Sequence, residues 1–454
     1  MDTSKNTLIV PTTIIKHADK IAFTKHMRWY MLLLLPLLSL SLQSCNSVFT
    51  SDPFQNKTTI NGHDVGINQN DQATFKGNIY FTLSHNLYVL NGQKQLTQLT
   101  HGIDARDPVV SPNGKWLAFT IYYTNYSNLA LMPASGGKYK ILLNGNGAYV
   151  PNGTNPPKST YHWYAQPSWA SDSEHLLILS NIEKTDFNPG LDAFMLDLML
   201  YQVDINNPGQ FTTPTYDGGV GAENDEVAYS TFGDGGLRDP SFRPGHPDQV
   251  IYTSYNYDAS SQYQVDQINL INVNAIEANL TAGSVYNYRP GVNAIESDPG
   301  VPLTAGDITK SATQDISNIM PSFSPDGNTI AYVRRINATQ MDLYTMPVAN
   351  GVTGPASGAP TFNPNDPTNL ANALKPYNKS SLLLSGQYIS DPIWSPDGTQ
   401  IIYYSYTKET FDLWLATLDK NPQTGAYSIK AGSQIQLTQA NGALDADSRP
   451  FWTA

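Results

Sequence analysis

The chain has 454 residues, with 26 basic and 38 acidic side chains and a formal net charge of −12 at neutral pH. This acidic balance argues against nucleic-acid binding, because contacts from lysine and arginine to phosphates supply most of that affinity. The single cysteine excludes a disulfide within the chain, so packing must stabilise the fold.

A short apolar segment lies near the N-terminus, at residues 27–45. Its apolar run, residues 31–42, is only twelve residues long and is interrupted by a proline. A helix that crosses a membrane needs about 20 apolar residues, so this run is typical of a signal peptide instead. We therefore predict a signal peptide over residues 1–44, with Met27 as a second candidate start.

The LQSC sequence that ends this segment resembles the lipobox of bacterial lipoproteins. The resemblance implies a lipid attached to Cys45 and a position on the periplasmic side of the bacterial envelope. Asn46, in place of an aspartate, implies the outer membrane. The alternative is an ordinary secretory signal followed by an incidental thiol. Residues 46–74 are polar and lack sustained periodicity, so we expect residues 45–74 to form a lipidated N-terminus and a flexible tether.

A phrase at residues 321–333, PSFSPDGNTIAYV, recurs at residues 392–404 as PIWSPDGTQIIYY. Pro325 presets φ for the second position of a β-turn, Asp326 can accept a hydrogen bond from the backbone two residues on, and Gly327 tolerates positive φ. The residues that follow alternate in β-branched and aromatic side chains, as in a pleated strand. Each phrase therefore predicts a strand, a tight turn and a second strand.

The first half of this phrase occurs six times, at intervals of 58 to 81 residues. The copies are PVVS (108–111), PSWA (167–170), PSFR (240–243), PSFS (321–324), PIWS (392–395) and PFWT (450–453). The clearest copies continue into the same succession of strand-like segments, so each repeat is predicted to be a four-stranded antiparallel meander.

The sixth copy lacks the turn and the three strands that should follow it. Residues 75–102 supply those three strands at the other end of the chain, as IYFTL, NLYVL and QLTQLT. One C-terminal strand would then complete a sheet begun by three N-terminal strands, which closes a ring and removes exposed edges. We predict an all-β fold: a six-bladed β-propeller of four-stranded antiparallel blades over residues 75–454. A seventh blade within the 81-residue interval is the alternative.

The run of LTxG, spacer, PxWSPDGxxIxY and then D-L-Y/W resembles the TolB-like propeller repeat, which is shared with the propeller domains of prolyl oligopeptidases and tricorn-type proteases. The resemblance covers residues 75–454 and is most specific at residues 321 and 392. The copies at 167 and 240 depart from the turn consensus. TolB itself carries an additional N-terminal α/β domain, where this chain has only the predicted tether.

Catalytic and metal motifs are missing from the sequence. There is no GxSxG nucleophile elbow, no HExxH and no calcium loop of the D-x-[DN]-x-[DN]-G type. Acidic clusters at residues 223–226 and 445–447 are interpreted as solvated loops, with calcium binding as the alternative. We therefore expect no cofactor and no metal, and a binding protein in preference to an enzyme.

Charged residues stand immediately before the prolines of four repeats. If these strands line the central channel, ring symmetry gathers the side chains at one mouth, where concave sites bind ligands by default. A mixed ring of this kind suits a peptide terminus, a sugar or a cation; the alternative is a set of structural salt bridges. The candidate mouth residues are Arg106, Asp107, Arg238, Asp239, Asp391, Asp447 and Arg449.

A dense aromatic group, Tyr161, His162, Trp163 and Tyr164, lies in a long loop rich in Gly, Pro and Asn. Such loops suit recognition from a rigid scaffold, by sugar stacking or partner binding. Packing of the loop onto the propeller is the alternative.

These observations predict a monomeric, lipid-anchored propeller of the cell envelope that binds an envelope protein or a peptidoglycan-associated partner. The second hypothesis is a lyase or hydrolase acting on an envelope polysaccharide or glycan through the channel mouth. Fold alone does not decide between them.

Overall fold

A computed structural model describes most of one compact unit of the chain, Pro53–Ala454. The described residues are 52–149, 158–182, 198–208, 226–228, 236–258, 263–272, 317–348 and 377–454. The predicted signal peptide, Cys45 and most of two long segments between predicted strands, 206–238 and 351–380, lie outside them. Within these ranges, no helix is both long enough and apolar enough to cross a bilayer.

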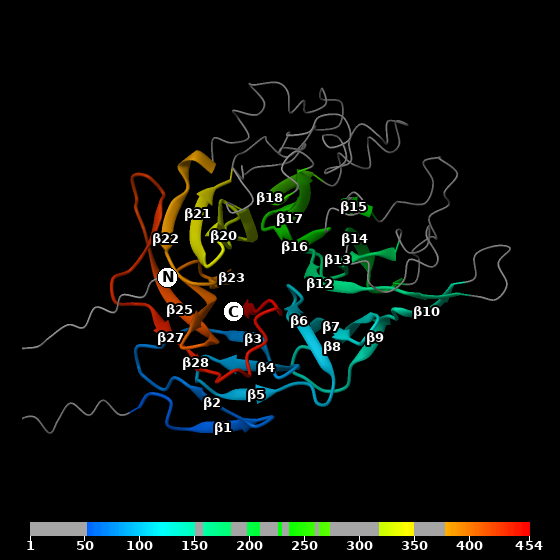
Figure 1. The fold of residues 1–454 in the computed structure, drawn as a ribbon, viewed down its shortest axis with the longest axis horizontal. Helices are drawn as coiled ribbons and strands as arrows, with labels where there is room; N and C mark the ends of the chain where they lie inside the picture. Colours follow the sequence, from blue (N-terminus) through cyan, green and yellow to red (C-terminus); the bar gives the residue numbers. More distant parts are fainter. Residues whose placement is uncertain are drawn as a thin grey trace, which may run out of the picture. The chain divides into compact units, whose positions relative to one another are not determined.

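The described residues form an all-β propeller of seven antiparallel sheets of three to five strands, with one separate hairpin (Figure 1). Four sheets have four strands, and three of them follow the predicted meander in chain order: β6 (Asp104–Val110), β7 (Trp116–Tyr122), β8 (Ser127–Pro133) and β9 (Lys140–Leu143); β12 (Tyr164–Trp169), β13 (His175–Ser180), β14 (Met199–Asp204) and β15 (Glu226–Ala228); β19 (Ser317–Phe323), β20 (Thr329–Asn337), β21 (Gln340–Pro347) and β22 (Ser381–Leu384).

Two further sheets depart from four strands. One has three, β16 (Leu237–Arg243), β17 (His246–Asp258) and β18 (Tyr263–Asn272); the other has five, β23 (Ser390–Trp394), β24 (Gln400–Thr407), β25 (Thr410–Lys420), β26 (Tyr427–Ile429) and β27 (Ile435–Gln436). The hairpin consists of β10 (Asn146–Tyr149) and β11 (Lys158–Tyr161), and a short 3-10 helix spans Tyr377–Lys379.

The SPDG turns have the predicted geometry. Gly327 has φ of 66°, and its N–H donates to the carbonyl of Ser324 at 2.8 Å. Asp326 Oδ1 accepts the backbone N–H of Asn328, two residues on, at 3.0 Å, and also the hydroxyl of Ser324. The same pattern recurs around Asp397. The turn therefore orients the strand that leaves it by side-chain hydrogen bonds.

The two ends of the compact unit meet in one sheet, as predicted. Strand β29 (Phe451–Thr453) pairs with β3 (Asn78–Leu83), which is followed by β4 (Asn86–Asn91) and β5 (Leu96–Gln98). Trp452 is opposite Ile79, and its indole N–H donates to the carbonyl of Lys76 at 2.8 Å. Gly77 has φ of 80°, and a Cβ there would lie 1.9 Å from the carbonyl oxygen of Thr453, so only glycine fits beneath the last strand.

The prediction of six four-stranded blades closed by this one strand is wrong, because a seventh sheet joins the ends a second time. It consists of β1 (Lys57–Ile60), β2 (His63–Ile67) and β28 (Thr438–Gln439). Part of the segment predicted as a flexible tether is therefore folded. Val65 and Ile67 are buried against Leu437, which gives this polar-looking segment a hydrophobic face. None of the strands of this sheet carries the proline phrase, so the repeat pattern does not predict it.

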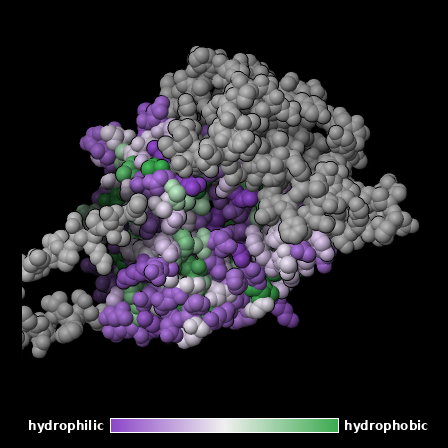
Figure 2. Space-filling view, viewed as in Figure 1, coloured by the Kyte–Doolittle hydropathy of each residue, from purple (hydrophilic) through white to green (hydrophobic). Residues whose placement is uncertain are grey.

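The apolar core lies between neighbouring sheets. One cluster joins Tyr80 and Leu87, from the sheet that contains the last strand, to Leu117 and Phe119 of the next sheet. Figure 2 shows a mostly hydrophilic surface over β1 and β2, with small hydrophobic patches. The stacked sheets thus hold the first strands of the repeats in fixed places, and the C-terminal end of the chain, marked C in Figure 1, lies among them.

Candidate functional site

A cavity of about 680 Å³ lies where the first strands of the repeats come together. The prolines of all six copies of the phrase line it: Pro108, Pro167, Pro240, Pro321, Pro392 and Pro450. Asp107, Asp239, Asp391 and Arg449 also line the cavity, so the structure gathers four of the seven predicted mouth residues. These residues are far apart in sequence, and the ring alone brings them together.

The backbone before each of the first five prolines has an unusual conformation. Asp107, Gln166, Asp239, Met320 and Asp391 all have positive φ, between 47° and 58°. In each case the pairing with the next strand shifts register at this point, as in a β-bulge. Left-handed backbone is sparsely populated by non-glycine residues, and bulges re-aim side chains. The bulge recurs at the same position in five sheets, so it is a regular feature of the repeat.

A belt of hydrogen bonds connects these bulges from sheet to sheet. The Asp107 N–H donates to Ser448 Oγ at 2.8 Å, and the Gln166 N–H donates to Asp107 Oδ2 at 3.3 Å. The Asp239 N–H donates to Gln166 Oε1 at 2.7 Å. The Asp239 carboxylate accepts the hydroxyl of Thr253. That hydroxyl in turn accepts the N–H of Met320. Asp107 and Asp239 therefore have a structural role in tying adjacent sheets together.

Asp391 is outside this belt. Its residue is only 6% exposed, and no hydrogen bond to its carboxylate is found among the described residues. Ser390 Oγ, beside it, is buried and makes no hydrogen bond of normal geometry. Burial, followed by the nearby charge of Asp239, raises the pKa of Asp391 to about 8, against the weaker opposing effects of Arg449 and of the Ser390 hydroxyl.

Arg449 extends across the cavity to two other sheets. Its Nη1 donates to the carbonyl of Pro240, and its Nη2 donates to the carbonyls of Gln166 and Pro167, each at 3.3 Å. Its backbone N–H donates to Asp107 Oδ1 at 3.0 Å. The Nε atom is buried and has no acceptor. The guanidinium thus has long bonds to three carbonyls and one donor left without a partner.

The other predicted mouth residues lie outside the cavity lining. Arg106 pairs with Asp104, at 2.7 Å from Nε to Oδ1, and with Asp447, and it lies 4.7 Å above the ring of Tyr122. Arg238 lies 5.4 Å from the ring centre of Tyr255. For Arg106 the alternative of a structural ion pair is therefore the better description.

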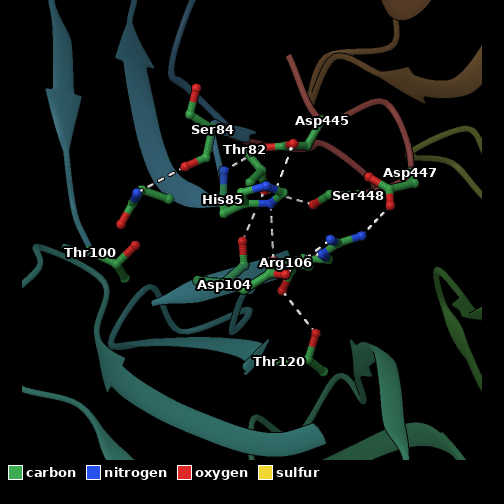
Figure 3. Close-up of polar contacts among 12 residues, drawn as sticks. Thr82, Ser84, His85, Thr100, Asp104, Arg106, Thr120, Asp445, Asp447 and Ser448 are labelled. Carbon is green, nitrogen blue, oxygen red and sulfur yellow. Dashed lines mark hydrogen bonds and ion pairs between the residues drawn. The ribbon is translucent and has the colours of Figure 1, made fainter. Parts of the chain in front are cut away.

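A polar cluster that the sequence did not predict lies beside Arg106 (Figure 3). His85, in the tight turn between β3 and β4, has its Nδ1 atom 3.4 Å from Asp104 and 3.6 Å from Asp445. Its backbone N–H donates to Asp445 Oδ2 at 2.7 Å. Asp445 belongs to the acidic cluster interpreted as a solvated loop. The structure instead uses it to hold this turn against residues near the C-terminus.

The aromatic group does not form one surface. Tyr161 stacks on Tyr126 with ring centres 6.0 Å apart, whereas Trp163 contacts Tyr122 edge to face at 5.6 Å. His162 contacts Tyr164 edge to face, and Tyr164 is buried in the core. No group of three or more His, Cys, Asp or Glu in the described ranges is arranged to hold a metal ion.

No protein-family model and no curated protein matches this chain. Among solved structures, it is similar to TolB from Acinetobacter baumannii, with 14% identity and a TM-score of 0.46 over 83% of this chain. It spans 66% of that TolB chain, which is less than two thirds. TolB from Agrobacterium tumefaciens has 14% identity and a TM-score of 0.41, over 72% of this chain and 85% of that one.

An oligogalacturonate lyase in complex with manganese is similar at 14% identity and a TM-score of 0.39, over 83% of this chain and 82% of that one. With identities this low and TM-scores below 0.5, none of these similarities says what the chain binds or does.

Proposed function

We propose that this protein is a binding module whose central cavity receives a group from a partner in the cell envelope. The observation that carries the proposal is the cavity itself, about 680 Å³ in volume and walled by one proline from each of six sheets. A rigid, largely apolar wall with a few convergent polar groups is the usual form of a ligand site.

Binding is favoured over catalysis by what the cavity carboxylates do. Asp107 and Asp239 accept hydrogen bonds from neighbouring sheets, so they are held as structural acceptors. Arg449 is bonded to backbone carbonyls. An acid–base pair for bond cleavage needs groups that are within reach of a substrate proton. Of the three aspartates that line this cavity, only Asp391 accepts no hydrogen bond from a neighbouring sheet.

The proposed setting is the periplasmic side of a bacterial envelope. It rests on the signal-like segment and on Cys45 as the lipid attachment site, both outside the described residues. The proposed partner is an envelope protein or a peptidoglycan-associated component, bound by a monomeric propeller. Metabolic labelling with a radioactive fatty acid tests the anchor: label is expected in the natural protein and absent after Cys45→Ser.

The test of the cavity is to fill it. Ser322 lines the cavity, and Ser322→Trp would occupy part of its volume. Ser428→Trp, on an exposed position of β26, is the matched control. Protein coupled to beads is incubated with a solubilised envelope fraction. We expect a partner that the natural protein and Ser428→Trp retain and that Ser322→Trp loses while its melting temperature is unchanged. Equal retention by Ser322→Trp would refute the proposal.

The second candidate is an enzyme acting on an envelope glycan, and the observation that favours it is His85. This imidazole is 56% exposed in its side chain and lies beside two carboxylates, those of Asp104 and Asp445. Histidine between carboxylates is suited to general-base catalysis. Release of reducing or unsaturated sugars from envelope polysaccharide, lost in His85→Ala, would favour this candidate over the binding module.

A further inference from the structure

Three aspartates reach the cavity from equivalent bulges, yet only one is without hydrogen bonds. Asp107 accepts the N–H groups of Gln166 and Arg449, and Asp239 accepts from Gln166 and Thr253. Each of these residues stands immediately before a repeat proline, and Arg449 is the next such residue after Asp391. By the same pattern, Asp391 would accept the N–H of Arg449. That N–H donates to Asp107 instead.

The belt therefore leaves Asp391 as a buried carboxylate that lines an open volume. Buried polar groups are normally hydrogen-bonded, and each exception requires an explanation. A carboxylate that lines a cavity without hydrogen-bond donors is the expected state of an acceptor site before its ligand arrives.

The charged residues that line the cavity indicate the sign of the charge on its ligand. The side chains that line it and carry a charge when ionised near neutral pH are those of three aspartates and one arginine, and no described lysine or histidine joins them. Arg449 directs its terminal nitrogens to backbone carbonyls, so an anionic ligand would have to displace those bonds. The described residues contain no group of three or more His, Cys, Asp or Glu that could hold a metal ion.

We infer that the ligand inserts an organic cation, an ammonium or guanidinium group, that pairs with the Asp391 carboxylate. This inference rests on the proposed function and names the chemistry of its ligand. A cation of this kind supplies the hydrogen-bond donors that Asp391 lacks and offsets its negative charge. The cavity volume is sufficient for a lysine or arginine side chain, and the apolar prolines suit its aliphatic stem.

Binding of the cation is coupled to proton release. The ionisable groups that influence Asp391 or are influenced by it are Asp239, Asp107, Arg449, Tyr255 and Tyr404. Burial and Asp239 raise the pKa of Asp391 to about 8, so the empty site is mainly protonated at pH 7. A cation favours the ionised form. Affinity should therefore increase as pH rises from 6 to 8, by at most roughly tenfold per unit, and then level off.

The probes are blocked single residues, N-acetyl-lysine methylamide and N-acetyl-arginine methylamide, with N-acetyl-norleucine methylamide as the neutral control. Putrescine tests whether the ligand is a free small amine and not a side chain of a protein. Titration calorimetry in two buffers of different ionisation enthalpy measures both affinity and protons released. We expect a cationic probe to bind at least about tenfold more tightly than norleucine.

The variant is Asp391→Asn, because asparagine tolerates left-handed backbone, has nearly the same shape and cannot ionise. Asp419→Asn, exposed on β25, is the matched control. We expect Asp391→Asn to lose at least about tenfold in affinity for the cationic probe and to lose the proton release. Asp419→Asn should do neither.

Three results would overturn the inference: norleucine binding as tightly as lysine, unchanged binding to Asp391→Asn, or no cationic binding at concentrations on the order of 10 mM. If these results occur while Ser322→Trp still abolishes partner capture, the cavity remains the binding site and only its ligand chemistry is wrong. If partner capture is also insensitive to Ser322→Trp, the proposed function fails as well.

Discussion

Replacement of Trp452 tests whether the last strand stabilises the ring. Its side chain is 5% exposed, packs edge to face on Phe75 at 6.0 Å, and donates its indole N–H to the carbonyl of Lys76 at 2.8 Å. Truncation of a buried tryptophan to alanine costs about 3–5 kcal/mol. Loss of this partly buried hydrogen bond leaves the Lys76 carbonyl without its donor, a cost of about 1–3 kcal/mol that is partly included in that range. We expect Trp452→Ala to lower the free energy of unfolding by about 4 kcal/mol.

Equilibrium unfolding in urea, followed by circular dichroism, provides the measurement. Trp452→Phe separates the two contributions, because it keeps most of the ring packing and removes the N–H; we expect a loss of about 1–2 kcal/mol. Trp414→Ala is the control, since that half-buried side chain has a buried N–H with no acceptor. A loss below about 1 kcal/mol in Trp452→Ala would refute the reasoning that β29 holds the ring together.

Three other predictions follow. Gly77→Ala should destabilise the fold by several kcal/mol in the same urea assay, at least about 2, because its Cβ would collide with the Thr453 carbonyl; a neutral effect would contradict the described contact. Val65→Asp should also destabilise by roughly 3 kcal/mol, since it places a charge in the core contributed by the seventh sheet, whereas a free tether would tolerate it. In the folded protein Asp391 keeps its proton up to about pH 8, whereas in the unfolded chain an aspartate loses its proton near pH 4. The free energy of unfolding should therefore fall by roughly 1 kcal/mol per pH unit between these two values. Asp391→Asn should remove this fall.

The turns, the blade strands and the pairing of the two ends followed from local chemistry in the sequence. The residues of SPDG favour a tight turn by themselves. The last repeat lacks three strands at the C-terminus, and the three strands that complete its sheet lie near the N-terminus. The seventh sheet was not predicted because β28 is only two residues long and its partners lie in a polar segment. Within that segment, the alternation of Val65 and Ile67 was the available signal, too short to outweigh the surrounding composition.

The site was predicted in part for a similar reason. Ring symmetry places residues at equivalent positions together, so Asp107, Asp239 and Asp391 meet. Symmetry does not predict which of these carboxylates accept hydrogen bonds from neighbouring sheets. Asp107 and Asp239 accept such bonds, and Asp391 does not. The His85 cluster depends on Asp445, 360 residues away, and no spacing rule connects residues across the junction of the two ends.

The pairing of β29 with β3 also constrains the timing of folding. Phe451 is opposite Tyr80, so about 370 residues separate the partners. Pairing between residues this far apart in sequence is slow, because the intervening chain must be ordered before the contact forms. During synthesis, the first-made strands must therefore wait with an unpaired edge until that whole stretch has left the ribosome. A holding chaperone that shields the edge of β3 over this interval would raise the yield of closed rings without altering their final stability.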